Sequence, residues 1–240
     1  MSARRFSLRV DGIPVEAAPG QSILQACDAA GVYIPRLCDH PDLPPAGHCR
    51  VCICLVDGRR ACACTTPAAA GQVVLNDTPE LQDERRAMVE LLFIEGNHYC
   101  HFCERSGDCE LQALGYRLGM SVPRWPYLWP RRELDGSHPD VFIDHDRCIL
   151  CSRCIRASRL EDGKSLFGFE GRGIRMRLKV EAEGHLDATA LAAADQAVRV
   201  CPVGCIGVKR TAFRVPRGMR RYDQTPIGAD IEARREPLKD

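Results

Sequence analysis

Cysteine is the residue type that dominates the chemistry of this sequence. The 240 residues include 15 cysteines, and most of them fall into three spaced groups. In a secreted chain this number would predict disulfides, but the N-terminus has no apolar segment of signal-peptide type. We therefore expect a cytoplasmic, reducing environment, where grouped cysteines are more often metal ligands. The sequence predicts metal centres.

The first group is Cys38, Cys49 and Cys52, with Cys62 or Cys64 as the fourth thiolate. An iron–sulfur cluster needs four thiolates around a compact inorganic core, and a long loop can present three of them. A four-cysteine zinc site is the alternative. Zinc ribbons normally use two tight Cys-x2-Cys pairs, however, and this group has one. The spacing favours a [2Fe–2S] cluster.

The second group, Cys100, Cys103 and Cys109, is one ligand short of a [4Fe–4S] site. His98 precedes Cys100 by two residues and His101 follows it directly. Imidazole can replace a thiolate on cluster iron. The same residue types also allow a zinc site with three cysteines and one histidine. Spacing alone does not decide whether His98 is the fourth ligand.

The third group is the most specific. The run of Cys148, Cys151 and Cys154 opens in the manner of bacterial ferredoxins, whose fourth cysteine belongs to the other cluster and precedes a proline. Cys201 precedes Pro202 in this way, and Ser158 stands where the first run would place its own fourth cysteine. The positions that would open a second run are Leu191, Ala194 and Ala197. We therefore predict a single [4Fe–4S] cluster bound by Cys148, Cys151, Cys154 and Cys201.

The elements that must position these groups divide the chain into four regions. Residues 1–78 predict a small β-rich domain, with a hairpin turning at Asp11-Gly12 and a helix over 21–30 that Gly31 ends. Residues 79–119 predict helices, the first capped by Thr78 and the second by Asp108. Residues 120–215 begin with a connector or docking segment to about 140, followed by a strand over 173–180 and an alanine-rich helix over 188–200. Residues 216–240 predict a tail that is loose until a partner orders it.

Composition excludes several function classes. The chain has 33 basic and 32 acidic side chains, a net charge of +1, so it lacks the basic excess typical of nucleic-acid or membrane-surface proteins. No apolar run approaches the roughly 18 residues of a membrane helix. No glycine-rich phosphate loop of recognisable form is present to bind NAD or flavin. These observations favour an electron carrier over an enzyme with its own substrate site.

The motifs LCDHPDLPPAGHCRVC, CTTP, EGNHYCHFCERSGDCELQ, DRCILCSRC and CPVG resemble the N-terminal region of the large iron–sulfur subunit of respiratory complex I. They resemble still more closely the small diaphorase subunit of cytoplasmic NAD-reducing [NiFe]-hydrogenases. This resemblance implies an α+β chain with a plant-type ferredoxin-like (β-grasp) domain, a helical segment with a one-histidine cluster, and a bacterial-ferredoxin-like domain. It implies Cys64 rather than Cys62 in the first set, and His98 in the second. In complex I the histidine occupies the position of Gly96.

The resemblance also implies a function. It predicts a non-catalytic electron-transfer subunit that relays single electrons between a flavin- and NAD-binding subunit and the two [NiFe]-hydrogenase subunits. Complex I subunits and NAD-dependent formate dehydrogenases continue into a large further domain, whereas this sequence stops shortly after Cys205. That length favours the hydrogenase type. A formate dehydrogenase or bifurcating hydrogenase module, or a structural zinc protein, is the alternative.

Overall fold

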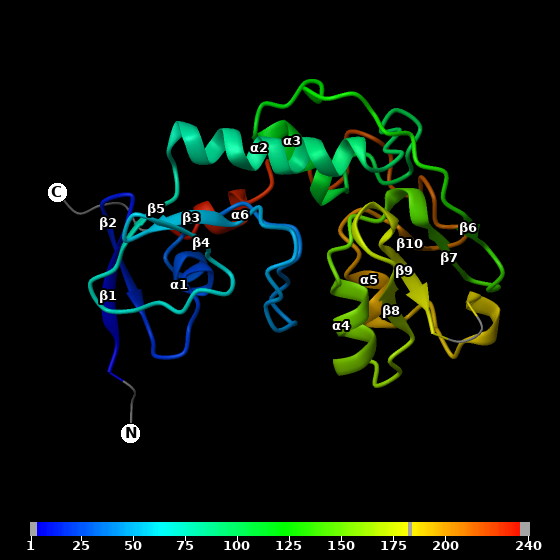
Figure 1. Ribbon diagram of the computed structural model, residues 1–240, viewed down its shortest axis with the longest axis horizontal. Coiled ribbons are helices and arrows are strands. Elements are labelled where there is room, and N and C mark those ends of the chain that lie inside the picture. The colour runs from blue at the N-terminus through cyan, green and yellow to red at the C-terminus, as the bar shows by residue number, and fades with distance from the viewer. Residues whose placement is uncertain (1–3, 182–183, 236–240) are drawn as a thin grey trace.

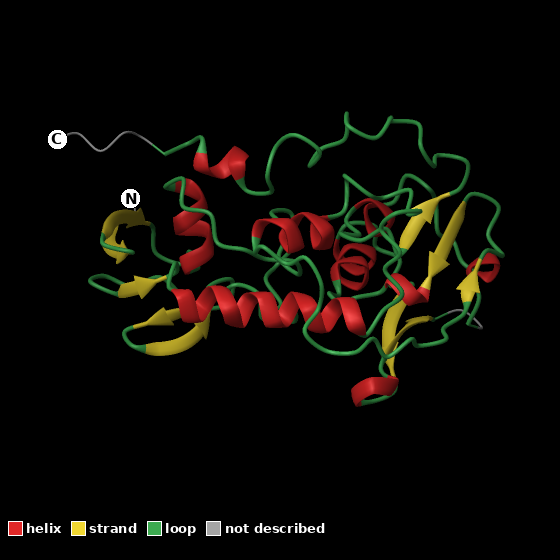
Figure 2. Ribbon diagram, turned by 90° about the horizontal axis from the view of Figure 1, so that it is seen from above, coloured by secondary structure: helices red, strands yellow, loops and turns green. Residues whose placement is uncertain are grey.

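The computed structural model describes residues 4–181 and 184–235. It is an α+β structure with strands at its two ends and helices between them (Figures 1 and 2). The strands of the first sheet are β1 (Phe6–Val10), β2 (Ile13–Ala17), β3 (Ile53–Val56), β4 (Arg59–Cys62) and β5 (Val73–Leu75). Their order is β2-β1-β5-β3-β4, with β1 and β5 parallel and the other pairs antiparallel.

The local sequence explains how the first domain begins. Asp11 and Gly12 both have positive φ, 49° and 81°, as the predicted primed turn requires. Ser22 caps α1 (Ile23–Ala29) with a reciprocal hydrogen bond to Gln25, and Gly31, at φ 71°, follows the helix end. The apolar face of α1, including Cys27, is fully buried against the sheet. The hairpin and the helix agree with the prediction, and Cys27 is a core residue.

Two helices lie across the middle of the molecule (Figure 1). The first, α2 (Pro79–Ile94), begins at its predicted cap Thr78, whose hydroxyl accepts a hydrogen bond from the Leu81 backbone N–H. The second, α3 (Glu110–Arg117), is capped by Cys109 and not by the predicted Asp108. The predicted ligand Cys109 is thus also the N-cap residue of a helix that packs against α2.

The far end of the molecule carries two small sheets. One has the strand order β10-β7-β6 and the other pairs β8 with β9. The strands are β6 (Leu134–Asp135), β7 (Val141–Asp144), β8 (Phe167–Glu170), β9 (Arg177–Val180) and β10 (Ile206–Val208). The helices are η1 (His145–Arg147), α4 (Arg153–Leu160), η2 (Gly173–Arg175), η3 (Leu186–Ala188), α5 (Gln196–Arg199) and, near the C-terminus, α6 (Ala229–Glu232).

Two predicted elements of this region are shorter than expected. The strand over 173–180 is only β9, because residues 173–175 form a 3-10 turn. The helix over 188–200 is only α5. Its start is fixed by Asp162, whose carboxylate accepts from the backbone N–H groups of Gln196 and Ala197, and Asp195 accepts from Ala192 N–H instead of continuing a helix. Side-chain capping overrides the helix propensity of the alanines.

The prediction of a loose tail is wrong for residues 216–235. Arg220 is buried and donates to the carbonyls of Glu104 and Ser106, while Ile227 and Ile231 join the larger apolar core. The α6 segment lies beside the N-terminal domain, where Gly228 packs on the Tyr33 ring. Residues 236–240 lie outside the described part. Residues 216–235 therefore pack against both the central helical segment and the first domain.

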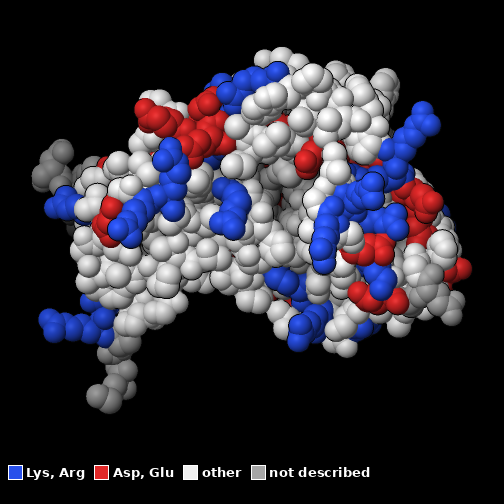
Figure 3. Space-filling view, in the orientation of Figure 1, with Lys and Arg blue, Asp and Glu red and all other residues white. Residues whose placement is uncertain are grey.

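On the face shown in Figure 3, basic and acidic side chains are interspersed, and neither sign covers that face alone. This distribution agrees with the near-zero net charge of the sequence. Among the residues described, no helix has the length and apolar character needed to cross a membrane.

Candidate iron–sulfur sites

The first site lies where the loop between α1 and β3 meets the turn after β4. The Cys38 thiol contacts those of Cys49 and Cys64, and the Cys52 thiol also contacts Cys64. The Cys38 backbone N–H donates to Cys49 Sγ at 3.4 Å. Cys38, Cys52 and Cys64 are at most 1% exposed. The structure brings the four predicted ligands together in one buried group.

Cys62 and Cys64 differ in which of the other thiols their side chains contact. Cys64 contacts both Cys38 and Cys52, so it links the two halves of the group. Cys62 contacts only Cys52 among these thiols and takes a hydrogen bond from Arg50 Nη1 at 3.6 Å, toward the surface. Cys64 is the better placed fourth donor.

The second site is built from turns between α2 and α3. His98, Cys103 and Cys109 line one cavity of about 280 Å³, together with Arg147 and Val203. Cys100 and His98 line an adjoining cavity of about 330 Å³. The backbone bends tightly between His98 and Cys100, because the Cys100 N–H donates to the His98 carbonyl at 3.1 Å. His101 is exposed and lines only the second of these cavities.

The His98 ring has the properties of a ligand. Its Nε2 atom is shielded from solvent and has no hydrogen-bond partner, whereas the ring does reach the Leu92 carbonyl. Burial lowers the pKa of His98 to about 4, so the imidazole is neutral at neutral pH. Metal-binding histidines are neutral and are oriented by a bond at the other ring nitrogen. The buried, unpartnered Nε2 is therefore an available donor.

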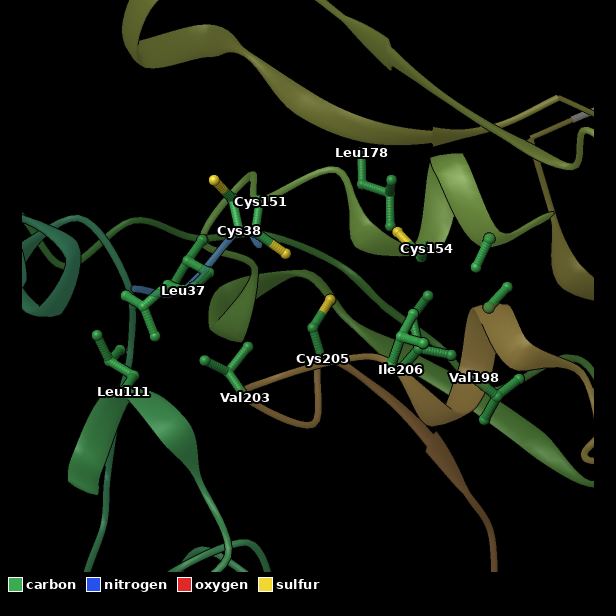
Figure 4. Packing of buried hydrophobic residues seen from close by; sticks show 14 of the residues in the cluster. Leu37, Cys38, Leu111, Cys151, Cys154, Leu178, Val198, Val203, Cys205 and Ile206 are labelled. Carbon is green, nitrogen blue, oxygen red and sulfur yellow. The ribbon is translucent and has the colours of Figure 1, made fainter. Parts of the chain in front are cut away.

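The third site is an apolar cavity at the start of α4. Cys148, Cys151, Cys154 and Cys201 all line it. Leu150 and Ser152 adopt positive φ angles of 52° and 61°, which turn the Cys-x2-Cys-x2-Cys run around the cavity. Figure 4 shows the Cys151 and Cys154 side chains close to the segment that carries Val203 and Cys205. The four predicted ligands are brought together.

Spacing gave no role to Cys205, yet it lines the same cavity and its thiol contacts that of Cys148. The remaining spare thiol, Cys54, is buried in the first domain, with its Sγ 3.6 Å from Arg85 Nη2. Cysteine spacing could not have identified these contacts. Both thiols lie outside the motifs, next to the predicted ligands in the folded chain.

The third site touches both of the others. From α4, Arg156 donates to the carbonyl of Cys38, and Cys38 and Cys151 belong to one packed cluster (Figure 4). Toward the second site, Val203 lines both cavities, and Glu110 N–H donates to the Pro202 carbonyl at 2.9 Å. The spatial order is first, third, second, which differs from the order along the chain.

The arginines near the third run have separate roles. Arg153 is 3% exposed and forms a bidentate pair with Glu110, at 2.8 and 2.7 Å. Arg147 pairs with Glu104 and Asp144 beside the second site, whereas Arg159 is exposed to solvent. Of the four arginines, Arg147, Arg153 and Arg156 therefore bond to other parts of the chain, and Arg159 is exposed.

The donor sets fit iron–sulfur clusters. Burial raises the pKa values of Cys109 and Cys151 to about 12, so that as free thiols they stay protonated at neutral pH. Thiolates in such places need the positive charge of a metal centre. The thiols, the neutral His98 and the apolar lining of the third cavity supply what a cluster requires: soft donors and exclusion of water.

Comparison with protein families assigns each region. Residues 3–79 match the model of a 2Fe-2S iron-sulfur cluster binding domain. Residues 85–124 match the NADH-ubiquinone oxidoreductase-G iron-sulfur binding region, and residues 141–208 match a 4Fe-4S single cluster domain. The predicted sequence of a [2Fe–2S] domain followed by 4Fe–4S domains is confirmed.

Individual relatives match nearly the whole chain. The NAD-reducing hydrogenase HoxS subunit gamma of Cupriavidus necator is 40% identical over 225 residues, which are 93% of this chain and 96% of that protein. The chain belongs to this gamma-subunit family. The solved structure of an NAD+-reducing [NiFe]-hydrogenase in the H2-reduced state contains a similar chain, with a TM-score of 0.92 and 44% identity over 97% of this chain and 99% of that one.

Family membership confirms the resemblance drawn from the motifs, including its complex I branch. The 78 kDa subunit of mitochondrial NADH-ubiquinone oxidoreductase from Neurospora crassa is 31% identical over 86% of this chain, but that match covers only 28% of the longer protein. For the hydrogenase gamma subunit the two lengths agree. The individual ligand assignments stay predictions that the geometry supports.

Proposed function

We propose that this chain relays single electrons between a flavin- and NAD-binding diaphorase subunit and the small and large subunits of a [NiFe]-hydrogenase, in the reaction H2 + NAD+ = NADH + H+. The supporting observation is three groups of buried or half-buried donors on a chain that matches the hydrogenase gamma subunit along nearly its whole length. One [2Fe–2S] and two [4Fe–4S] clusters would occupy these sites. When bound, each accepts and passes on one electron.

The proposed ligands are those predicted from the sequence. They are Cys38, Cys49, Cys52 and Cys64 at the [2Fe–2S] site; His98, Cys100, Cys103 and Cys109 at the second site; and Cys148, Cys151, Cys154 and Cys201 at the third. The surrounding residues shield the donor atoms from water and fix the distances between the three sites. Because the third site contacts both others, we place it in the middle of the relay.

The second site lies at one end of this path, close to the surface. Tyr99, Phe102 and Tyr116 are 57%, 84% and 70% exposed around it, and Tyr127 stacks on Trp129 nearby. Exposed aromatic groups of this kind mark interaction surfaces. We propose that a partner subunit covers this end. A cytoplasmic location remains a prediction from the sequence.

Metal analysis tests the clusters directly. The proposal expects about ten irons per chain, a brown colour and paramagnetic signals on reduction. Two or three zinc ions with no visible absorption would instead establish a structural zinc protein.

Purification of the native complex tests the partner. We expect co-purification with a flavin subunit and a [NiFe]-hydrogenase, and hydrogen-driven reduction of NAD+. NAD+ reduction driven by formate and not by hydrogen would assign the chain to a formate dehydrogenase. Because the hydrogenase gamma subunit matches over both lengths, we favour the hydrogenase outcome.

A further inference from the structure

Arg85, on the face of α2 that packs against β3, is a fully buried charge, with an exposure of 0%. Its Nη1 donates to the Asn76 carbonyl at 2.8 Å. Its Nη2 donates to the Ile53 carbonyl and to Asn76 Oδ1, each at 2.7 Å, and lies 3.6 Å from Cys54 Sγ. Every one of these partners is neutral. The guanidinium is held in place without a direct ion pair, and Asp77, the carboxylate whose charge acts on it, accepts a hydrogen bond from Gln82 Nε2 instead.

No ion pair found among the described residues includes Arg85. The carboxylate of Asp11 accepts from the backbone N–H groups of Asn76 and Asp77, and Glu84 pairs with Arg60. Arg153, which is 3% exposed, shows how a buried guanidinium can be balanced, because it forms an ion pair with the carboxylate of Glu110. A buried cation without an anion is strongly unfavourable, so a compensating negative charge is expected nearby.

The proposed [2Fe–2S] site is next to this guanidinium. Arg85 bonds the carbonyl of Ile53, which directly follows the proposed ligand Cys52. Cys54, the thiol in contact with Arg85, also lies 3.7 Å from the carbonyl oxygen of Cys52. A [2Fe–2S] core with four thiolates carries net negative charge, and reduction adds one electron to it. The cluster would supply a negative charge close to the Arg85 guanidinium, which has no ion-pair partner among the described residues.

We propose that Arg85 is the buried counter-charge of the [2Fe–2S] cluster and raises its reduction potential. The inference rests on the proposed cluster site. A fixed cation in a low-dielectric interior favours the more negative, reduced state, and solvent ions do not screen it. Asn76 positions the guanidinium, since its carbonyl and Oδ1 accept from two different nitrogens of Arg85. The charge sets how readily this carrier accepts an electron in the relay.

A redox titration of the intact complex, followed by the paramagnetic signal of the reduced [2Fe–2S] cluster, tests the charge. We expect Arg85→Gln to lower the equilibrium constant for reduction at least tenfold, which is about 59 mV for a one-electron couple. Arg85→Lys, which keeps the charge, should stay within threefold of the wild type. The matched control is Arg86→Gln on the same helix, because Arg86 donates to the Leu118 carbonyl, on the α3 side.

Asn76→Asp is a second variant that leaves Arg85 in place. It is nearly isosteric and sets a carboxylate 2.7 Å from Arg85 Nη2, which neutralises the guanidinium. We expect a fall in potential in the same direction as for Arg85→Gln, even if that variant fails to assemble.

Three outcomes overturn the inference. They are an unchanged potential in Asn76→Asp, an unchanged potential in an assembled Arg85→Gln, and an equal shift in Arg85→Lys and Arg85→Gln. Absence of any [2Fe–2S] signal from the wild-type complex is a different result, because it removes the proposed cluster itself.

Discussion

The first and second sites are each proposed to present four donor atoms to an iron–sulfur cluster, but their surroundings differ. The first is held by the N-terminal sheet, and the thiols of Cys38 and Cys64 are fully buried. In the second, the motif itself lies in consecutive turns, with Phe102 84% exposed between two of its cysteines. The Nε2 atom of its predicted histidine donor has no hydrogen-bond partner, whereas the first-site thiols contact one another.

This contrast indicates how each site is completed. The first site is shielded from water by its own sheet and by α4, whose Arg156 donates to the Cys38 carbonyl, so its properties depend on internal groups such as Arg85. The second site lies at the end of the path, under exposed aromatic side chains that we expect a partner to cover. Changes at the first site should therefore act inside the isolated chain. Changes at the second should also alter transfer to the partner.

The largest expected effect is removal of a first-site ligand. Cys64→Ala should abolish the [2Fe–2S] signal and lower the iron content from about ten to about eight per chain, since Cys64 links Cys38 with Cys52. Iron analysis and paramagnetic resonance measure both. Cys62→Ala is the matched control and should keep the cluster. The reverse result would exchange the roles of the two cysteines.

The second-site histidine should tolerate one replacement and not another. His98→Cys supplies a thiolate at the same position, so we expect the second cluster to persist with an altered potential. His98→Ala should lose that cluster's signal, because the shielded Nε2 would have no substitute. Redox titration of the complex provides the measurement. His101→Ala should leave the signal untouched, and loss of the signal only in that variant would assign the ligand to His101.

Gly96 should be needed at the second site because there is no room for a side chain, and not because its backbone conformation requires glycine. A Cβ on Gly96 would lie 2.6 Å from His98 Nε2 and 2.7 Å from the Asp146 carbonyl oxygen. Gly96→Ala should therefore displace the imidazole and reduce occupancy of the second cluster severalfold, measured as iron per chain. Gly136→Ala is the control, since its nearest contact is an ordinary 3.6 Å. Full occupancy in Gly96→Ala would show that His98 binds from another position.

Local chemistry explains what the sequence could predict. The Asp11-Gly12 turn and the Thr78-Pro79 start of α2 each depend on neighbouring residues alone, and both occur as predicted. Cysteine spacing likewise predicted the first and third groups, whose thiols lie together in the fold, and a second group whose members line two adjoining cavities. These features need no knowledge of how distant segments pack.

The failures involve contacts between distant segments. Arg220 is buried because its guanidinium meets carbonyls more than a hundred residues away, which the charge pattern of the tail does not reveal. The position of the third site between the other two depends on Arg156 reaching Cys38, and the shortened helix at α5 depends on Asp162. The buried charge of Arg85 is also invisible until α2 packs on the sheet.

The smallest expected effect is on stability, at the junction between the second and third sites. Glu110→Gln would leave the guanidinium of Arg153, 3% exposed, without its anion. Because Glu110 itself keeps 19% exposure, we expect a loss of about 2 kcal/mol in unfolding free energy, below the 3–5 kcal/mol or so typical of fully buried pairs. Denaturant unfolding of the cluster-loaded chain measures it. Glu170→Gln, which breaks an exposed pair with Arg177 in the same region, should cost less than about 0.5 kcal/mol. Equal losses in the two variants would mean that the Arg153–Glu110 pair does not fasten the second site to the third.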